Sequence, residues 1–171
     1  MTEYREVFEY PFSPLSPDAP HVDPPAVAVY QTLLVRGPDG GPAPAMAREW
    51  TVSEDGLTWL LRLRDDLPFH AGGPATSREV LATLQRLREH CLPGDRQLWY
   101  WDPVRDVDAP DEQTIRLRLH YPHPRLFTLL WGTHTAIHDE ALRAALGEDF
   151  GRTAASGTGR YRMAGWDPTR I

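Results

Sequence analysis

Hydrophobic and polar residues alternate in two stretches of the chain, and each stretch predicts a β-hairpin. In the first, Trp50 and Val52 precede a turn at 54–56, after which apolar residues return at every second position, Leu57, Trp59, Leu61 and Leu63. In the second, a turn at 109–112 precedes the alternating residues Ile115, Leu117 and Leu119. Each hairpin therefore has one apolar face, which must be buried against other elements.

Apolar residues at steps of three and four predict helices in other parts of the chain. Thr76-Ser77-Arg78-Glu79 has the pattern of a capping box, and the apolar stripe that follows it is Val80, Leu84, Leu87 and Cys91. Four more elements are expected: a helix over 24–34, a short helix within 122–130, a short strand over 133–137, and a helix over 139–146 that ends at Gly147. Hairpins backed by a few helices predict an α+β (mixed α/β) fold, without regular βαβ alternation.

The amino-acid composition limits the kinds of partner that this chain is expected to bind. The chain has 18 basic residues, all of them arginine, and 24 acidic residues, which give a formal net charge of -6. The charges are dispersed, whereas nucleic-acid binding needs a concentrated basic patch, so no nucleic-acid partner is expected. The single cysteine, Cys91, excludes an internal disulfide. No apolar run reaches the ~18 residues of a membrane span, so none is predicted.

Candidate motifs for catalysis and metal binding are incomplete. Two histidine pairs each lack a third ligand at the spacing of a metal site, namely His120 with His123 and His134 with His138. Ser156 has no glycine two positions before it, as a nucleophile elbow requires, and Gly157-Thr-Gly159 lacks the third glycine of a dinucleotide-binding loop. We therefore predict a protein that is not an enzyme, with no cofactor and no metal site.

An aromatic cluster, Trp99-Tyr100-Trp101, follows the apolar stripe that begins at Val80. Aromatic side chains on a loop provide a large, rigid and amphipathic contact area. Two interpretations are open on the sequence alone. The cluster covers the apolar face of a hairpin, or it forms a wall that faces a ligand.

Several segments occur in an order that is typical of one protein family. They are Pro44-Ala-Met-Ala-Arg-Glu-Trp50, Val52-Ser-Glu-Asp-Gly-Leu-Thr58, Phe69-His70-Ala-Gly-Gly-Pro-Ala-Thr76 and Gly157-Thr-Gly-Arg-Tyr161. Together, over about residues 23–166, they resemble the family 5 extracellular solute-binding proteins, the peptide- and nickel-binding components of ABC transporters. The chain departs from the usual motifs at Ala71, where the family has aspartate, and at Arg160, where it has proline.

The resemblance implies a two-lobed periplasmic-binding-protein-like fold (type II), of which this chain is an incomplete N-terminal part. Residues 1–36 would begin lobe I, residues 37–150 would form a middle subdomain of hairpins and helices, and residues 151–171 would return to lobe I. The turn at 157–159 reads as the entry to a new strand, so we expect an N-terminal fragment. Because the family encloses its ligand between two lobes, we expect this chain alone to be unable to bind ligand usefully.

The implied function is that of the substrate-binding component of an ABC transporter, which captures peptides or a related small solute and delivers it to the permease. Its implied location is extracytoplasmic, in the periplasm or at the cell surface. No signal peptide is visible, so a cytoplasmic location stays open. Two alternatives are a ligand-sensing module of a cytoplasmic transcriptional regulator and a non-functional truncated remnant.

The resemblance also implies particular ligand contacts. In the nickel-binding branch, a tryptophan that closely follows an Arg-Gln-Leu segment contacts the ligand, and here residues 96–98 precede Trp99 and Trp101, of which Trp101 matches by spacing. His134 falls near the place where that branch supplies a cationic contact. His21, in the proline-rich segment that opens lobe I, is a further candidate. The predicted ligand-binding residues are therefore Trp101, His134, His21 and Trp99.

Overall fold

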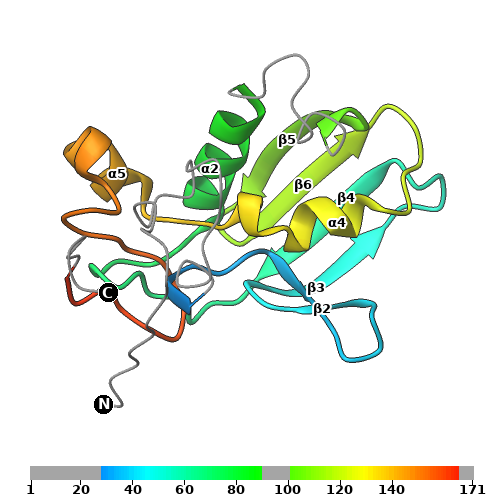
Figure 1. The fold of residues 1–171 in the computed structure, drawn as a ribbon. Helices are drawn as coiled ribbons and strands as arrows, with labels where there is room; N and C mark the ends of the chain where they lie inside the picture. The colour runs from blue at the N-terminus through cyan, green and yellow to red at the C-terminus, as the bar shows by residue number, and fades with distance from the viewer. Residues whose placement is uncertain (1–27, 90–100, 166–171) are drawn as a thin grey trace, which may run out of the picture.

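The computed structural model describes residues 28–89 and 101–165. In chain order its elements are β1 (Leu34–Arg36), β2 (Pro42–Pro44), β3 (Ala47–Val52), β4 (Thr58–Leu63), α2 (Ser77–Glu89), β5 (Val104–Asp111), β6 (Thr114–Leu119), α4 (Leu126–Trp131), the 3-10 turn η1 (Thr133–Thr135), α5 (Glu140–Leu146) and the 3-10 turn η2 (Gly147–Asp149). Strands and helices are interspersed along the chain (Figure 1), which gives the mixed character that the hydrophobic pattern predicts.

Both predicted hairpins are confirmed, and they join into one antiparallel sheet of four strands in the order β3-β4-β6-β5. The link between the hairpins is β4, which pairs with β3 and also with β6, where Trp59 lies opposite Leu117. The second turn is tighter than predicted, since β5 continues to Asp111 and β6 begins at Thr114. The Asp111 carboxylate holds that turn by accepting from the Gln113 amide at 2.9 Å and from the Thr114 hydroxyl at 2.8 Å.

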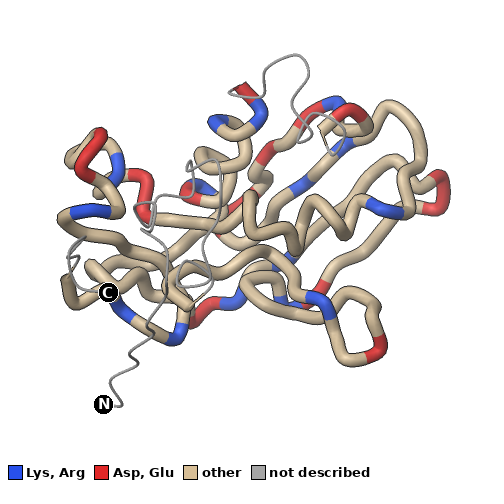
Figure 2. Tube along the Cα trace, in the orientation of Figure 1, with Lys and Arg blue, Asp and Glu red and all other residues tan. Residues whose placement is uncertain are grey.

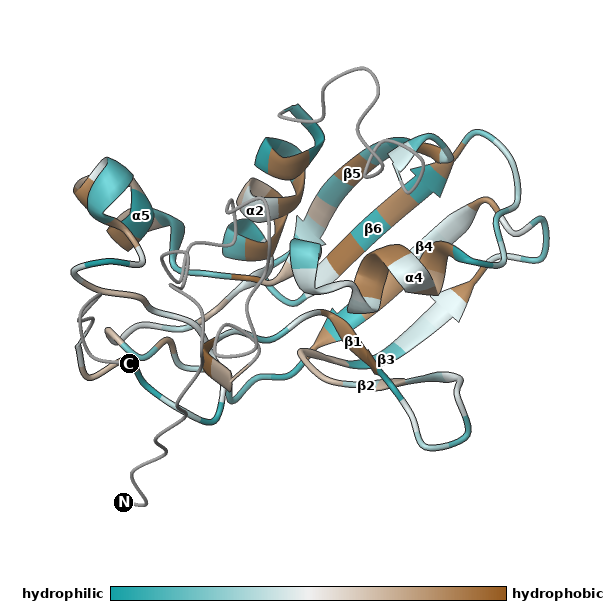
Figure 3. Ribbon diagram, in the orientation of Figure 1, coloured by the Kyte–Doolittle hydropathy of each residue, from teal (hydrophilic) through white to brown (hydrophobic). Residues whose placement is uncertain are grey.

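The apolar face of this sheet is covered by α2 and α4 (Figure 1). Alternate residues of β4 and β6 are buried against these helices, and the colouring of Figure 3 shows the alternation along β6. The fully buried residues of this main core come from both strands and both helices, and include Leu61, Leu63, Leu84, Ile115, Leu117, Leu126, Leu129 and Leu130. Burial of such side chains stabilises the fold by about 1.5–3 kcal/mol each. The sheet and its two helices thus form one packed unit.

The opposite face of the sheet carries a ladder of ion pairs between β5 and β6, and Figure 2 shows acidic and basic positions on these two strands. The register places Asp106 opposite Arg118 and Asp108 opposite Arg116. The Arg116 guanidinium donates to both oxygens of Asp108, at 2.9 and 2.8 Å. This hydrogen bonding lowers the pKa of the Asp108 carboxyl below its usual value. Opposite charges on directly facing residues help to fix the register of the two strands.

Two predicted helix boundaries are confirmed by their capping contacts. Before α2, the Glu79 carboxylate accepts from the Thr76 amide at 2.9 Å, as a capping box requires. Before α5, the Asp139 carboxylate accepts from the Leu142 amide at 3.0 Å. Gly147 follows α5 with a φ of 55°, in the half of the backbone map that glycine enters without strain.

Two predicted elements are wrong. Of the helix predicted over 24–34, the described part is helical only at residues 28–29, and Leu34–Arg36 forms β1 instead. The strand predicted over 133–137 is the 3-10 turn η1 followed by a single bridge. In the first place tertiary pairing overrides the local pattern, because the Ile137 amide donates to the Gln31 carbonyl at 2.8 Å and residue 31 is extended. In the second, local hydrogen bonds form the 3-10 turn, from the Thr135 amide to the Gly132 carbonyl at 2.8 Å and from the Ala136 amide to the Thr133 carbonyl at 3.2 Å.

Candidate ligand-binding site

Two segments that are far apart in the sequence, residues 28–31 and 157–161, lie side by side, and we call their junction the seam (Figure 1). Neither segment belongs to the four-stranded sheet. Two backbone hydrogen bonds join them, from the Gly159 amide to the Val29 carbonyl at 2.9 Å and from the Tyr161 amide to the Ala28 carbonyl at 3.0 Å. The seam therefore ties the beginning of the described chain to its end.

The seam requires glycine at positions 157 and 159. A Cβ on Gly157 would lie 2.3 Å from the Val29 carbonyl oxygen, and a Cβ on Gly159 would lie 2.4 Å from the Ala28 carbonyl oxygen. Both oxygens belong to the backbone, so no side-chain rotation relieves the overlap. The Gly-Thr-Gly motif of the sequence thus has a physical cause, which is that two backbones must approach closely enough to form hydrogen bonds.

His70 ties a second sequence motif to the seam. Its backbone amide donates to the Gly157 carbonyl at 3.0 Å, and its Nε2 lies 2.8 Å from the Gly159 carbonyl oxygen. A carbonyl oxygen only accepts, so Nε2 carries the proton in this contact, and Nδ1 faces the Gly157 amide at 3.4 Å. In the sequence, His70 stands out only as part of the Phe-His motif. Its role becomes visible when that motif and the Gly-Thr-Gly motif are placed together.

Replacing His70 with alanine should lower the free energy of unfolding by about 1–3 kcal/mol, because the Gly159 carbonyl then loses its partner in a partly buried place. Urea unfolding at neutral pH measures this loss. His120→Ala is the matched control, since His120 is exposed. Equal unfolding midpoints for the two variants would show that His70 does not hold the seam.

A cavity of about 410 Å³ lies against the seam. This volume falls within the roughly 300–1,000 Å³ range of small-molecule sites. The cavity is bounded by residues 28–36, 131–136 and 159–161, so it depends on three stretches of chain meeting at one place. Its walls combine the aromatic side chains of Tyr30, Trp131 and Tyr161 with the polar side chains of Gln31, Thr133 and Arg160. The cavity is the candidate site for a small solute.

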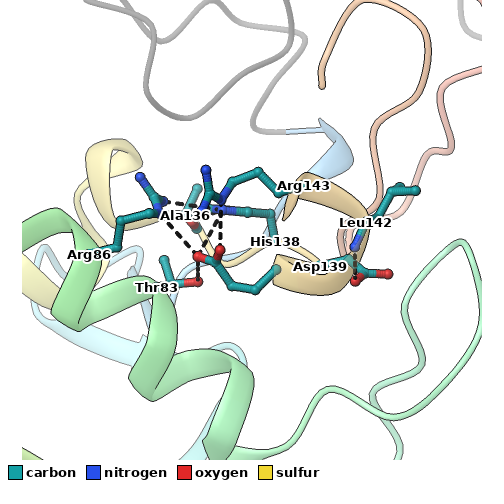
Figure 4. Close-up of polar contacts among 8 residues, drawn as sticks. Thr83, Arg86, Ala136, His138, Asp139, Leu142 and Arg143 are labelled. Atoms are coloured by element: carbon teal, nitrogen blue, oxygen red, sulfur yellow. Dashed lines mark hydrogen bonds and ion pairs between the residues drawn. The ribbon is translucent and has the colours of Figure 1, made fainter. Parts of the chain in front are cut away.

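A buried polar cluster supports the cavity wall and joins α2 to α5 (Figure 4). The Glu140 carboxylate accepts hydrogen bonds from Arg86 at 3.1 Å and from Arg143 at 2.7 Å. The fully buried His138 places its Nε2 3.1 Å from the same carboxylate. Its ring meets the Tyr30 ring edge-on, with the ring centres 6.2 Å apart. Since Tyr30 lines the cavity, the cluster helps to set the position of that wall.

Glu140 is ionised in this cluster. Burial by itself would raise the pKa of its carboxyl, but hydrogen bonds with His138 and Arg143 and the charge of Arg86 outweigh burial and bring the pKa far below its ordinary value. The Arg86 and Glu140 side chains are only 11% and 16% exposed, so water screens this pair weakly. The ionised carboxylate therefore balances the positive charges packed around it.

The structure describes two of the four residues that the sequence predicts to contact the ligand, Trp101 and His134. His21 and Trp99 lie outside the described residues. Trp101 is 3% exposed and packs in the main core under the sheet. Of the two interpretations of the aromatic cluster, the packing of Trp101 matches the one in which the side chain covers a hairpin. A ligand contact for Trp101, Trp99 or His21 stays a prediction.

His134 lies on η1, next to the cavity-lining residue Thr133. Its ring packs over Gly132, where an added Cβ would come within 2.1 Å of the imidazole Cε1. Burial lowers the pKa of the imidazole, so His134 is uncharged at neutral pH. A ligand contact for His134 also stays a prediction. Arg160 lines the cavity but was not among the predicted ligand contacts. The only signal for it in the sequence was that it replaces the proline of the usual Gly-Thr-Gly motif.

The described residues include neither a cluster of metal ligands nor a membrane-spanning helix. Within residues 28–89 and 101–165, no group of three or more His, Cys, Asp or Glu side chains is placed to hold a metal ion. No helix in the described part of the chain has the length and apolar character needed to cross a bilayer.

Comparison with known proteins identifies the family. A family model described as bacterial extracellular solute-binding proteins, family 5 middle, matches residues 41–171. The chain belongs to this family. Family 5 membership confirms the resemblance seen in the sequence, and it places the chain among solute-binding proteins rather than enzymes, as predicted.

Two curated relatives of this family 5 chain are named for their ligands. A probable peptide ABC transporter periplasmic-binding protein of Sinorhizobium fredii is 29% identical over 119 residues, which cover 70% of this chain and 22% of that protein. The glutathione-binding protein GsiB of Escherichia coli O1:K1 is 29% identical over 124 residues, which cover 72% of this chain and 24% of that protein. The chain thus spans about a quarter of the length of these relatives.

A solved structure of similar fold confirms the predicted fold class. The peptide-bound OppA of Listeria monocytogenes matches 90% of this family 5 chain with a TM-score of 0.76, at 18% sequence identity, and the match covers 35% of that protein. The described residues are therefore part of a mixed α/β periplasmic-binding-protein fold. The division into residues 1–36, 37–150 and 151–171 stays a prediction.

Proposed function

We propose that this family 5 chain is part of the substrate-binding component of an ABC transporter, and that it captures peptides or a related small solute for uptake. The observation that carries the proposal is the cavity at the seam, in a chain that belongs to a solute-binding family. The two curated relatives favour peptides, since one is named for peptide transport and the other for glutathione, which is itself a short peptide. The same proposal includes an extracytoplasmic location for the protein and delivery of the solute to an ABC permease.

The cavity would supply one wall of the ligand site. The rings of Tyr30, Trp131 and Tyr161 offer flat apolar surfaces, and Gln31 and Thr133 offer hydrogen bonds to a peptide backbone. A second lobe, which the family resemblance implies, would close over the ligand and exclude water. With one wall alone, a bound solute stays half-solvated, so we expect this chain by itself to bind weakly.

We also propose the lobe arrangement that the family resemblance implies, in which residues 28–36 and 151–165 belong to lobe I. A second, smaller core supports it, in which Val29 and Tyr30 of the first segment pack with Ala155 of the second, together with Ala136 and Phe150 from the residues between them. This core is separate from the main core under the sheet, to which Leu33 and Leu34 contribute. Residues from both ends of the described chain therefore pack with one another, and the sheet with α2 and α4 forms the unit between them.

Chemical-shift mapping by NMR on the full 171-residue chain tests the proposed function, since NMR detects weak binding. Dipeptides and tripeptides, titrated to millimolar concentration, should shift the amide signals of residues 28–36, 131–136 and 159–161. The signals of β5 and β6 should not move, and they serve as the internal control. Nickel chelates and opines, titrated in the same way, test other classes of solute.

Each outcome of this experiment bears on the proposal. Shifts in the cavity segments with peptides support it fully. Shifts there with only a nickel chelate or an opine keep the site and overturn the ligand class. No shifts in these segments with any probe, or shifts confined to the sheet, would show that the cavity is not the ligand wall.

A further inference from the structure

The cavity lining is mainly apolar, and the charged side chains among its described residues are both arginines. Arg36 and Arg160 both line it, and no aspartate or glutamate is among the described residues that do so. Gln31 uses its side-chain oxygen to accept from the Thr158 hydroxyl at 2.9 Å, which leaves its NH2 group as a donor. The whole chain carries a net charge of -6, so the positive charge of the cavity lining is opposite in sign to the net charge of the chain. A lining of this kind suits a ligand group that is anionic and accepts hydrogen bonds.

The two arginines differ from those in the structural ion pairs. Arg86 is held by Glu140, and Arg116 is held by both oxygens of Asp108. Within the described residues, neither Arg36 nor Arg160 forms an ion pair with a carboxylate. An arginine without an internal partner keeps its full charge and donor set for a ligand. The cavity therefore has positive charge that the described fold does not neutralise.

We propose that this cavity binds a carboxylate of the transported solute, with Arg160 as the main contact. The inference rests on the proposed function and adds a substrate class to it, namely small acidic solutes such as peptides held by a terminal or side-chain carboxylate. Arg160 lies between Gly159 and Tyr161, whose amides are fixed in the seam, so the backbone beneath its side chain is held in place. The planar guanidinium matches a carboxylate through two parallel hydrogen bonds. Arg36, whose guanidinium extends beside Gly40, adds a second positive charge.

The same lining disfavours a solute amine at this place. The positive charge of the lining arginines repels an ammonium group, and no described lining carboxylate compensates. Because Arg160 is exposed, salt screens its attraction for a ligand carboxylate. Binding of an acidic probe should therefore weaken as ionic strength rises, whereas binding of its neutral analogue should not.

The test uses two probes that differ in charge, acetyl-trialanine and acetyl-trialanine amide, in shift mapping on the full chain. The carboxylate probe should bind in the cavity about tenfold more tightly than the amide, as expected for a charge-assisted hydrogen bond. Arg160→Gln should weaken binding of the carboxylate probe about tenfold and leave the amide unaffected. Arg162→Gln is the matched control, since Arg162 is exposed and does not line the cavity. Thermal melting verifies that both variants are folded.

The outcomes separate this inference from the proposed function. Equal binding of the two probes in the cavity would overturn the preference for a carboxylate and leave the proposed function standing. No shift in the cavity from either probe would count against both. Inorganic phosphate is titrated separately, and if it alone shifts the signals around Arg160, the site binds simple anions and the carboxylate assignment is wrong. Unchanged affinity in Arg160→Gln would also overturn the proposal.

Discussion

Gly159→Ala should break the seam and lower the free energy of unfolding by about 3 kcal/mol or more, since overpacking costs roughly 1–3 kcal/mol even where side chains can adjust. The added Cβ would lie 2.4 Å from the Ala28 carbonyl oxygen and 2.6 Å from the Val29 carbonyl oxygen. These same oxygens accept the two hydrogen bonds of the seam. The overlap is relieved only if the two segments separate, and then both bonds are lost. Urea unfolding measures the loss of stability.

Hydrogen exchange locates the effect of this substitution. The amides of Gly159 and Tyr161 should lose protection in the variant, while amides of the four-stranded sheet should keep it. Gly165→Ala is the control, because nothing lies within 4 Å of its added Cβ and its φ is not positive. If Gly159→Ala and Gly165→Ala were equally stable, the close approach of the two backbones would not occur in solution.

Glu140→Gln should cost about 3–5 kcal/mol at neutral pH, which is the usual effect of removing one partner from a buried ion pair. The glutamine side chain fills the same space, so packing changes little. The neutral amide removes the counter-charge that Glu140 supplies to Arg86, in a place where the arginine side chain is 11% exposed. Glu148→Gln is the control, because Glu148 is exposed. Thermal and urea unfolding of both variants give the comparison.

The contribution of Glu140 should also depend on pH in a defined direction. Its pKa is lower in the folded chain than the ordinary value of 4.5, so the folded state favours the ionised carboxylate. The difference in stability between the natural chain and Glu140→Gln is then fully present above pH 4.5 and declines as the pH falls below it. A difference that grew in acid would contradict the ion pair.

Local patterns in the sequence predicted the structure correctly where that structure depends on contacts between neighbouring residues. The capping box at Thr76 and the cap at Asp139 each involve contacts within a few positions, so their residues mark the helix starts directly. The two hairpins follow from strict alternation, because each apolar face has one place to be buried. The joining of the hairpins through β4 and β6 was not visible in the sequence, since the paired residues, from Thr58 with Arg118 to Arg62 with Thr114, are far apart along the chain.

Local signals failed where distant pairing decides the conformation. Residues 30–34 have helical spacing, yet the backbone of Gln31 pairs with Ile137 and the chain stays extended. The candidate site could not be predicted for the same reason, because its cavity is formed by three stretches of chain that are distant in the sequence and meet only at the seam. The Gly-Thr-Gly motif indicated that this position is important. The reason could not be read from the sequence, because it is a second backbone segment, whose oxygens would lie only 2.3–2.4 Å from a Cβ added at either glycine.

The contact between Gln31 and Thr158, whose side chains meet at 2.9 Å although 127 positions separate them, has a consequence for how this family can diversify. The chain between these two residues therefore begins and ends at the seam, and it returns to the seam on the way at His70 and Ile137. Domains whose entry and exit points coincide tolerate exchange, lengthening and permutation without disturbance of their host. Loops of the sheet and helices that do not contact the seam are thus free to vary in evolution or in engineered hybrids, provided that the glycines of the seam, His70 and the pairing at Ile137 are kept.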